Sequence, residues 1–331
     1  MSSTAYLGTI QSLFTRYGMT TYVTFGNLGN FLIIAVFAQP SQRRNPCSLY
    51  LLFMTICNLI CLDVGIIPII FALDHPDITT IYLTACRLQF YIRHASFQIM
   101  RTYKVLACID RFALSSMQTK IRSFSQYKVA VLSIIIGAIF WALVVIFFAM
   151  VRSIKNASCN IFDDLYLSIY TIYYLIFAGL VPPVLILIFS FLVMKNLKQM
   201  RSRIQPTHDA TGAGRLTLRK RDRDLMKMVL AEVMVYVIST LPFSIYLVYQ
   251  LITTSYVKSK DRKQIESFIN YMAQSFLMYL NTALPCYIYI ATSPSFRQQC
   301  KKIPIRFYAF ITGKKIRVDE TLESRSMTAN R

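Results

Sequence analysis

Residues 127–151, with the sequence YKVAVLSIIIGAIFWALVVIFFAMV, decide the fold, because no charged residue occurs between Lys128 and Arg152. A helix needs about 20 mostly apolar residues to cross the hydrocarbon core of a bilayer, and this stretch is long enough. The sequence therefore predicts an all-α membrane protein, in which a bundle of seven transmembrane helices occupies residues 17–291. The six other stretches that qualify are 17–38, 48–73, 83–116, 165–194, 225–253 and 265–291.

The composition agrees with a membrane protein. Hydrophobic residues make up 55% of the 331 residues and charged residues only 15%, a balance more apolar than that of soluble domains. The segments between the stretches are short, so we expect no separate soluble domain. Residues 1–16 lack a basic start followed by an apolar run, and we expect them to form an extracellular N-terminus without a cleavable signal peptide.

The net charge of +21 is unevenly distributed along the chain. Basic residues in alternate loops indicate a cytoplasmic side, which places the N-terminus outside and the protein in the plasma membrane. They do not form the continuous basic face that nucleic acid requires, so membrane lipid is an expected partner and nucleic acid is not. The basic residues of these loops and of the tail include Arg43, Arg44, Lys120, Arg122, Lys195, Lys198, Arg215, Arg219, Lys301 and Lys302.

Two of the eight cysteines lie on the predicted outer side. Cys86 and Cys159 both face an oxidising compartment in this topology, so we expect a disulfide between them. The same outer loop contains a glycosylation sequon at Asn156. The cysteines lack zinc-type spacing and the three histidines are scattered, so the sequence predicts no metal site, no cofactor and no enzyme.

Several residues stand at characteristic spacings along the seven stretches. They are Asn30 of a Gly-Asn pair, the outer Cys86, the triplet Asp110, Arg111 and Phe112, then Trp141, Pro242, Asn281, and Phe296 with Arg297. In this order they resemble the rhodopsin-like family of G-protein-coupled receptors, over residues 17–302. The resemblance implies an extracellular ligand, a heterotrimeric G protein as partner, and a short amphipathic helix within residues 292–331, before a cytoplasmic tail.

The sequence also departs from the family pattern. Asn58 stands where most relatives carry a sodium-binding aspartate, and Met100 replaces a serine that helps to bind this ion. A neutral amide and a thioether are poor ligands for a hard cation, so we expect no sodium site.

The seventh stretch carries an altered Asn-Pro-x-x-Tyr motif. Tyr289 takes the position of its tyrosine, whereas Pro285 lies one residue earlier than its proline. The run LPCYIY at residues 284–289 is similar to invertebrate FMRFamide-type peptide receptors and their orphan relatives, which implies a neuropeptide ligand.

The third stretch contains four cationic residues at membrane depth: Arg93, Arg101, Lys104 and Arg111. A charge that faced lipid would cost about 2.5 to 3.5 kcal/mol, and ionisable residues at this depth are functional candidates. Arg93, Lys104 and Arg111 are spaced by eleven and seven residues, which places them in one stripe along a helix. This stripe must therefore face protein or water.

The ligand pocket is expected near Arg93, where amine receptors carry an aspartate. Together with Arg87, Arg93 favours a ligand with an acidic group, such as a carboxylate, a phosphate or an acidic peptide. The basic pocket disfavours an amidated, arginine-containing peptide. In an alternative interpretation, Arg93 instead pairs with Asp63, or with Asp163 or Asp164.

The resemblance also implies how the resting state is held. Asp110 and Asp222 are expected to bind Arg111 until the sixth helix moves outward. Higher in the bundle, Lys104 and Glu232 replace two aliphatic residues of the relatives that touch, so we expect a buried salt bridge that forms a second latch. In the alternative, Glu232 is protonated and Lys104 pairs elsewhere.

A secondary transporter or channel would also carry charges within its spans, but paired half-repeats and broken helices are not apparent.

Cys300 beside Lys301 is a candidate for palmitoylation, and the hydroxyl residues of the tail are candidates for phosphorylation.

Overall fold

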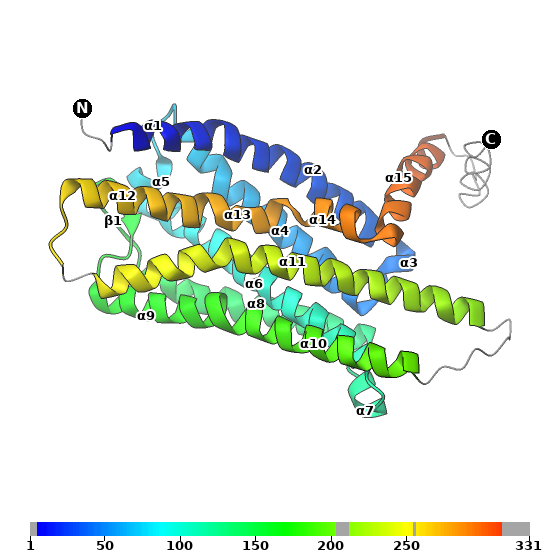
Figure 1. Ribbon diagram of the computed structural model, residues 1–331. Coiled ribbons are helices and arrows are strands. Elements are labelled where there is room, and N and C mark those ends of the chain that lie inside the picture. Colours follow the sequence, from blue (N-terminus) through cyan, green and yellow to red (C-terminus); the bar gives the residue numbers. More distant parts are fainter. Residues whose placement is uncertain (1–4, 203–211, 254–255, 313–331) are drawn as a thin grey trace.

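The structure, a computed structural model, describes residues 5–202, 212–253 and 256–312. Long helices lie side by side in a bundle, and a two-stranded hairpin lies at one end (Figure 1). The elements in chain order are α1 (Ala5–Leu13), η1 (Phe14–Met19), α2 (Thr20–Phe37), α3 (Pro40–Arg43), α4 (Pro46–Phe71), α5 (Ile78–Ile81), α6 (Leu83–Ser115), α7 (Thr119–Arg122), α8 (Tyr127–Met150), β1 (Ser153–Lys155), β2 (Ser158–Asn160), α9 (Asp164–Tyr174), η2 (Leu175–Leu180), α10 (Val181–Ser202), α11 (Gly212–Ile252), α12 (Lys260–Asn270), η3 (Tyr271–Leu277), α13 (Met278–Ala283), α14 (Pro285–Thr292) and α15 (Pro294–Thr312).

These elements combine into seven rods that run the length of the bundle. The backbone keeps right-handed helical angles on both sides of η1, η2 and η3, so these π-helical turns lie inside continuous helices. The rods are α1–η1–α2, α4, α6, α8, α9–η2–α10, α11 and α12–η3–α13–α14. The predicted fold class, a seven-helix bundle followed by a short helix, is confirmed.

Most of the rods have the length and composition of membrane spans. By these two criteria alone, five helices among the described residues can cross a membrane. They lie at Tyr6–Phe37, Pro46–Phe71, Tyr127–Met150, Asp164–Asn196 and Lys227–Ile252. The two remaining rods are less apolar for separate reasons: α6 contains the cationic stripe, and the last rod begins with the charged α12.

The first helix begins earlier than the sequence indicated. It starts at Ala5 instead of residue 17, because contacts at the end of the bundle support the extra turns. The Thr15 hydroxyl lies 2.7 Å from the Tyr271 hydroxyl, and Arg16 forms a 2.7 Å ion pair with Asp74. The predicted boundary at residue 16 therefore falls inside a helix.

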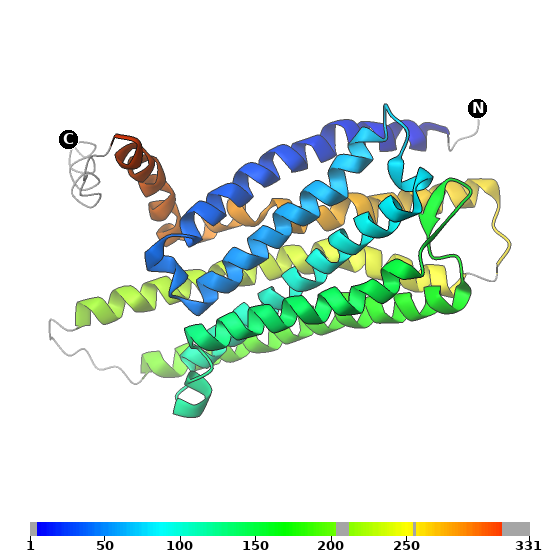
Figure 2. The same ribbon diagram turned by 180° about the vertical axis from the view of Figure 1, so that it is seen from behind.

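Helix α6 lies in the middle of the bundle. It packs against α4, α8, α10 and α11, and Figure 2 shows it in cyan between α4, in light blue, and α8, in green. This position buries its polar side chains, which include Arg101, Lys104, Asp110 and Arg111. The protein interior, and not lipid, therefore surrounds Lys104 and Arg111 of the predicted stripe, and Arg93 is partly buried.

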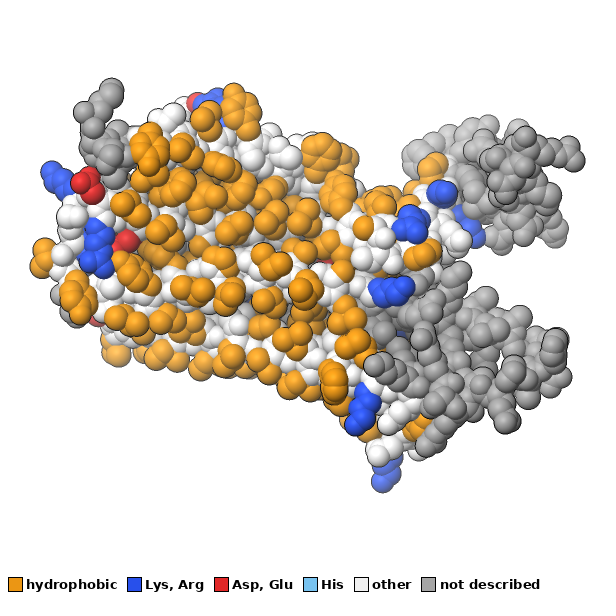
Figure 3. Space-filling view, viewed as in Figure 1, with side chains coloured by type: hydrophobic (Ala, Val, Ile, Leu, Met, Phe, Trp, Pro, Cys, Tyr) orange, Lys and Arg blue, Asp and Glu red, His pale blue; other side chains and the backbone are white. Residues whose placement is uncertain are grey.

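The outside of the bundle is apolar along its middle. Figure 3 shows a continuous cover of hydrophobic side chains, with lysine and arginine gathered toward the two ends. A soluble monomer rarely exposes an apolar surface of this extent, whereas a bilayer requires it. The exposed side chains include Leu132, Ile136, Phe140 and Leu143 of α8, Leu187 and Phe191 of α10, and Met234, Ile238 and Leu241 of α11.

The two ends of the bundle differ. The end with the hairpin and α12 is called the outer end below, and the end with α7 and α15 the inner end. In the hairpin Ser153 faces Asn160, and Asn156 and Ala157 form the turn with φ of 51° and 52°, angles that a two-residue hairpin turn requires. A disulfide joins Cys159 of this hairpin to Cys86 at the start of α6.

Helix α15 leaves the bundle at the inner end (Figure 1). Ser293 ends α14 with an extended backbone, and its hydroxyl accepts a hydrogen bond from the Phe296 amide at 3.1 Å. The Phe296 ring is buried, 6.0 Å from the Phe37 ring and 5.5 Å from the Tyr289 ring. This aromatic contact fixes the start of the short helix against the bundle.

We expect Cys86→Ala to lower the free energy of unfolding by about 2 to 5 kcal/mol, the usual effect of removing a native disulfide. The bond spans a sequence separation of 73 residues, so its loss releases a long loop in the unfolded chain. Thermal unfolding of the purified chain in detergent measures the change. Cys300→Ala, which removes a free cysteine at the inner end, should leave the midpoint unchanged, and equal midpoints for both variants would contradict the expectation.

Candidate functional site

The inner end of α6 holds a buried ion pair. Arg111 Nη2 donates to Asp110 Oδ2 at 2.6 Å and to Asn45 Oδ1 at 3.0 Å. Both charged side chains are almost fully buried, and Ser125 Oγ donates to the second Asp110 oxygen at 2.8 Å. The pair therefore joins α6 to the start of α4 and to the segment before α8.

Asn45 was not among the residues predicted for this site. It is the N-cap of α4, and its side-chain oxygen accepts hydrogen bonds from the Cys47 and Ser48 amides. The Asn-Pro sequence at 45–46 indicates a helix start, but not that the same oxygen also binds Arg111. The other expected partner of Arg111, the side chain of Asp222, lies outside the described residues. Phe112, next to Arg111, packs its ring 5.5 Å from that of Phe189.

The predicted salt bridge between Lys104 and Glu232 is wrong in its geometry. Lys104 Nζ donates to Asn281 Oδ1 at 2.8 Å and lies 5.4 Å from the centre of the Tyr236 ring. Neither carboxylate oxygen of Glu232 has a hydrogen-bond partner among the described residues, although the two charges act on each other. The reason is that α13 brings a neutral acceptor closer to the ammonium group than α11 brings the carboxylate.

Three more family positions lie in the bundle interior. Asn30 Nδ2 donates to the Thr282 carbonyl at 3.1 Å, which joins α2 to α13. Trp141 Nε1 donates to Thr102 Oγ1 at 2.6 Å, which joins α8 to α6. Asn58 is completely buried, and neither its amide oxygen nor its amide nitrogen has a partner in the part of the chain that the structure describes.

The two family prolines differ in their effect on the helices that contain them. Pro285 is the first residue of α14 and separates it from α13, whereas Pro242 lies inside the continuous α11. Cys286 packs against Gly29, where a Cβ atom would lie 2.8 Å from the cysteine Cβ. The buried Tyr289 follows on α14, near Glu232, and its hydroxyl has no hydrogen-bond partner of good geometry among the described residues.

The predicted ligand-pocket residues lie in the outer half of the bundle, with Asp63 on α4 and Arg87 and Arg93 on α6. Asp63 accepts a hydrogen bond from Asn27 Nδ2 at 2.7 Å, and Arg87 Nε donates to the Arg152 carbonyl at 3.2 Å. The Arg93 guanidinium lies beside the Tyr279 hydroxyl. No described carboxylate is within ion-pair distance of Arg93, so the alternative pairing of Arg93 with an aspartate is not what the structure contains.

Two buried arginines near this pocket did not belong to the predicted ligand-binding set. Arg101 points toward α9, and its Nη2 donates to the Tyr174 hydroxyl at 3.2 Å. Arg152, just after α8, places its guanidinium carbon 3.9 Å from the centre of the Phe90 ring. The position of Arg101 at membrane depth in the sequence indicated a functional residue. Arg152 follows a predicted helix directly, and the sequence alone does not distinguish it from an ordinary loop residue.

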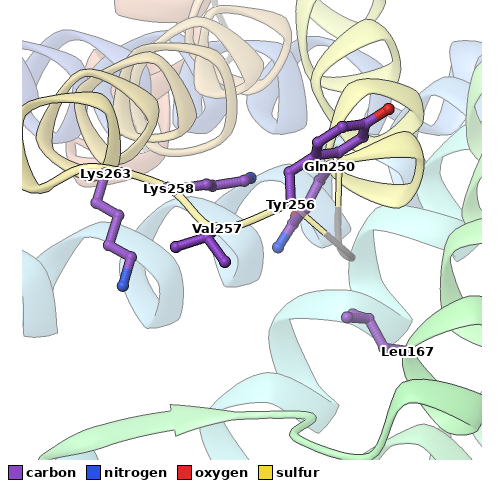
Figure 4. Close-up of a pocket in the computed structure, with 6 residues that line it drawn as sticks. All are labelled: Leu167, Gln250, Tyr256, Val257, Lys258 and Lys263. Carbon is purple, nitrogen blue, oxygen red and sulfur yellow. The ribbon is translucent and has the colours of Figure 1, made fainter.

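A cavity of about 380 Å³ opens at the outer end between α9, α11 and the connection to α12. Figure 4 shows Tyr256, Val257 and Lys258 along this connection, with Lys263 on the following helix and Leu167 across the opening; Gln250 completes the lining. Lys258 forms a 2.7 Å ion pair with Glu266. Since no salt bridge joins Lys263 to a described residue, the rim carries an uncompensated positive charge.

The predicted modification sites lie at opposite ends. Asn156 is exposed at the hairpin tip. Cys300 is a free, half-buried cysteine on α15. Occupancy of both sites stays a prediction, and the hydroxyl residues of the tail lie outside the described residues.

The chain matches the family model described as 7 transmembrane receptor (rhodopsin family) over residues 29–289. No curated protein matches it. The match concerns the family as a whole, and the resemblance of residues 284–289 to peptide receptors stays a prediction. Because the matched region covers most of the chain and reaches into every rod of the bundle, the chain belongs to the rhodopsin family of seven-transmembrane receptors and is a multi-pass membrane protein.

Proposed function

We propose that the chain is a G-protein-coupled receptor of the plasma membrane, with its N-terminus and its outer end extracellular. An extracellular ligand binds at the outer end, and a heterotrimeric G protein binds at the inner end after α11 moves outward. The observation that carries this proposal is the buried contact of Arg111 with Asp110 and Asn45, because a charge held inside the inner end becomes available to a partner only when the bundle opens.

The outer end supports binding of a ligand with an acidic group. The cavity there has Lys263 in its lining, which forms no salt bridge with a described residue, and Arg93 lies deeper in the same half of the bundle without an acidic partner among the described residues. Carboxylates and phosphates bind such groups through charge-assisted hydrogen bonds. Arg87 contributes a further positive charge near the hairpin.

The contact between α11 and the last rod favours movement of α11. The Glu232 carboxylate and the Tyr289 hydroxyl meet there, and both lack hydrogen-bond partners of good geometry in the described residues. Asn58, on α4, is equally unsatisfied. Burial of unsatisfied polar groups costs free energy, so admission of water between these helices offsets part of the packing that is lost when they separate.

The contacts of α6 supply the resting restraint. Lys104 joins α6 to α13 in the middle of the bundle, and Arg111 joins α6 to α4 at the inner end. A ligand shifts the balance between resting and active states only by its different affinity for the two. The ligand therefore has to supply enough difference in binding free energy to offset the contacts of Lys104 and Arg111 that are lost in the active state.

We expect Asp110→Asn to raise ligand-free nucleotide exchange on a heterotrimeric G protein about tenfold. Hydrogen bonds to charged groups contribute about 1.5 to 3 kcal/mol, and about 1.4 kcal/mol changes a ratio of states tenfold. Purified receptor in vesicles, mixed with G proteins of each class, gives the rate. Asp77→Asn, which neutralises a helix-capping aspartate at the outer end, is the matched control.

Asn45→Ser refines this test. Serine keeps the N-cap of α4 but is too short to reach Arg111, so exchange should rise while the unfolding midpoint stays close to that of the wild type. Unchanged exchange in both Asp110→Asn and Asn45→Ser, with every class of G protein, would contradict the proposed function. Substrate flux in the same vesicles without a nucleotide effect would assign the chain to transport.

The contact between Lys104 and Asn281 predicts a coupled pair of substitutions. Asn281→Leu should destabilise the chain by about 1.5 to 3 kcal/mol, because it leaves a buried ammonium group without its acceptor. Lys104→Met combined with Asn281→Leu should cost less than the sum of the single changes, since residues in contact are not additive. Thermal unfolding of the four chains measures the coupling. A coupling for Lys104 with Glu232 larger than that with Asn281 would show that the carboxylate is the dominant partner.

A further inference from the structure

Three arginines lie inside the outer half of the bundle without acidic partners. They are Arg93 and Arg101 on α6 and Arg152 after α8. No carboxylate among the described residues lies within ion-pair distance of any of them, and their electrostatic neighbours are mainly tyrosines. Arg101 and Arg152 are buried, and Arg93 is partly buried. A buried charge without a partner costs several kcal/mol, so this arrangement calls for a counterion.

Arg101 is the most deeply placed of the three. Only 2% of it is exposed, and its polar contacts are neutral: Nη1 donates to Gln98 Oε1 at 2.7 Å and Nη2 donates to the Tyr174 hydroxyl at 3.2 Å. Its Nε has no partner among the described residues. The guanidinium carbon lies 5.3 Å from the Phe97 ring centre and 5.4 Å from that of Tyr174, so ring faces supply part of its stabilisation.

Arg93 and Arg152 extend the positive region toward the outer end. The Arg152 Nη1 donates to the Cys159 carbonyl at 3.0 Å, while its Nε is unpartnered among the described residues. Burial lowers the pKa of Arg152 to about 10, and the nearby charge of Arg93 acts in the same direction. All three arginine charges act on the buried His94 of α6.

The nearby carboxylates serve other contacts. Asp63 accepts a hydrogen bond from Asn27, Asp163 caps α9, and Glu266 pairs with Lys258 and Arg262. The positive region is therefore not neutralised by the described part of the chain.

We propose that Arg101 and Arg93 form a buried anion site between α6, α9 and α13, which takes one small carboxylate or an inorganic anion of similar size. This proposal rests on the proposed function, because the carboxylate would be the acidic group of the extracellular ligand. The guanidinium groups supply the charge, and the Tyr279 hydroxyl supplies a neutral donor. The Tyr279 hydroxyl has no hydrogen-bond partner of good geometry among the described residues and lies beside Arg93.

The chemistry of the site favours a carboxylate. Guanidinium presents parallel N–H donors that match the two carboxylate oxygens, and Arg101 still has an unused Nε donor. The rings of Phe97 and Tyr174 beside it offer a surface for an apolar carbon next to the carboxylate. A phosphate has more oxygens and a larger charge than a carboxylate, and the site has too few donors to bind all of them.

The site is connected to the middle of the bundle by one helical turn on each side. Arg101 precedes Lys104 on α6, and Met278, whose sulfur lies 3.8 Å from Arg101 Nη2, precedes Asn281 on α13. Residues three apart on a helix are neighbours. An anion that draws Arg101 toward itself therefore acts directly above the contact of Lys104 with Asn281.

The test is thermal unfolding of the full chain in detergent, in a buffer whose only anion is a bulky sulfonate. Acetate, benzoate and chloride are then added separately at constant ionic strength. At a hundred times its dissociation constant, an anion that binds the folded state should raise the midpoint by about 4 °C or more. A saturable rise with acetate or benzoate alone identifies an organic carboxylate as the occupant, and an equal rise with chloride identifies an inorganic anion.

Arg101→Gln should abolish the rise while leaving the midpoint without added anion equal or higher, because the unpartnered charge is gone. Arg101→Lys, which keeps the charge without the planar fork, should reduce the rise. Arg262→Gln, at an exposed arginine of α12, should retain it. The absence of any saturable rise, or a rise that survives in Arg101→Gln, would overturn the proposal. Because no G protein enters this measurement, its outcome is independent of the exchange experiment with Asp110→Asn.

Discussion

The burial of positive charge along α6 is the constraint on which the rest of the bundle depends. A helix with Arg93, Arg101, Lys104 and Arg111 cannot face hydrocarbon without a large penalty, so it has to lie where other helices surround it. Helices α4, α8, α10 and α11 do so. Their own outward faces can then be uniformly apolar, because the polar groups of the chain are collected inside.

The compensation of these charges changes from one end of α6 to the other. At the inner end Arg111 has a full negative partner in Asp110, and in the middle Lys104 has a neutral amide oxygen. In the outer half Arg101 has a hydroxyl, an amide oxygen and two ring faces. The outer half therefore has the greatest unsatisfied demand for an anion, and it lies on the side where a ligand would arrive.

The contact between α11 and α14 shows the complementary property. Glu232 and Tyr289 are buried at this contact without hydrogen-bond partners of good geometry among the described residues, so the helices are held together there mainly by apolar packing. Breaking such a contact costs less than breaking one with paired polar groups, because water can satisfy what the protein does not. A bundle with firm contacts on α6 and a weaker one on α11 has a defined place at which to open.

The sequence by itself determined the seven helices, their order, the burial of α6 and most of the family positions, because apolar length and charge placement are properties of the chain that a bilayer selects directly. It did not determine the start of the first helix at Ala5, which depends on Tyr271 and Asp74 from distant segments. The sequence also predicted Glu232 as the partner of Lys104, where the structure has Asn281, and it did not indicate the roles of Asn45 and Arg152. Only the tertiary structure decided these, because the partner of a buried charge is whichever group neighbouring helices bring within hydrogen-bond distance, and helix spacing along one chain does not specify the offset between helices.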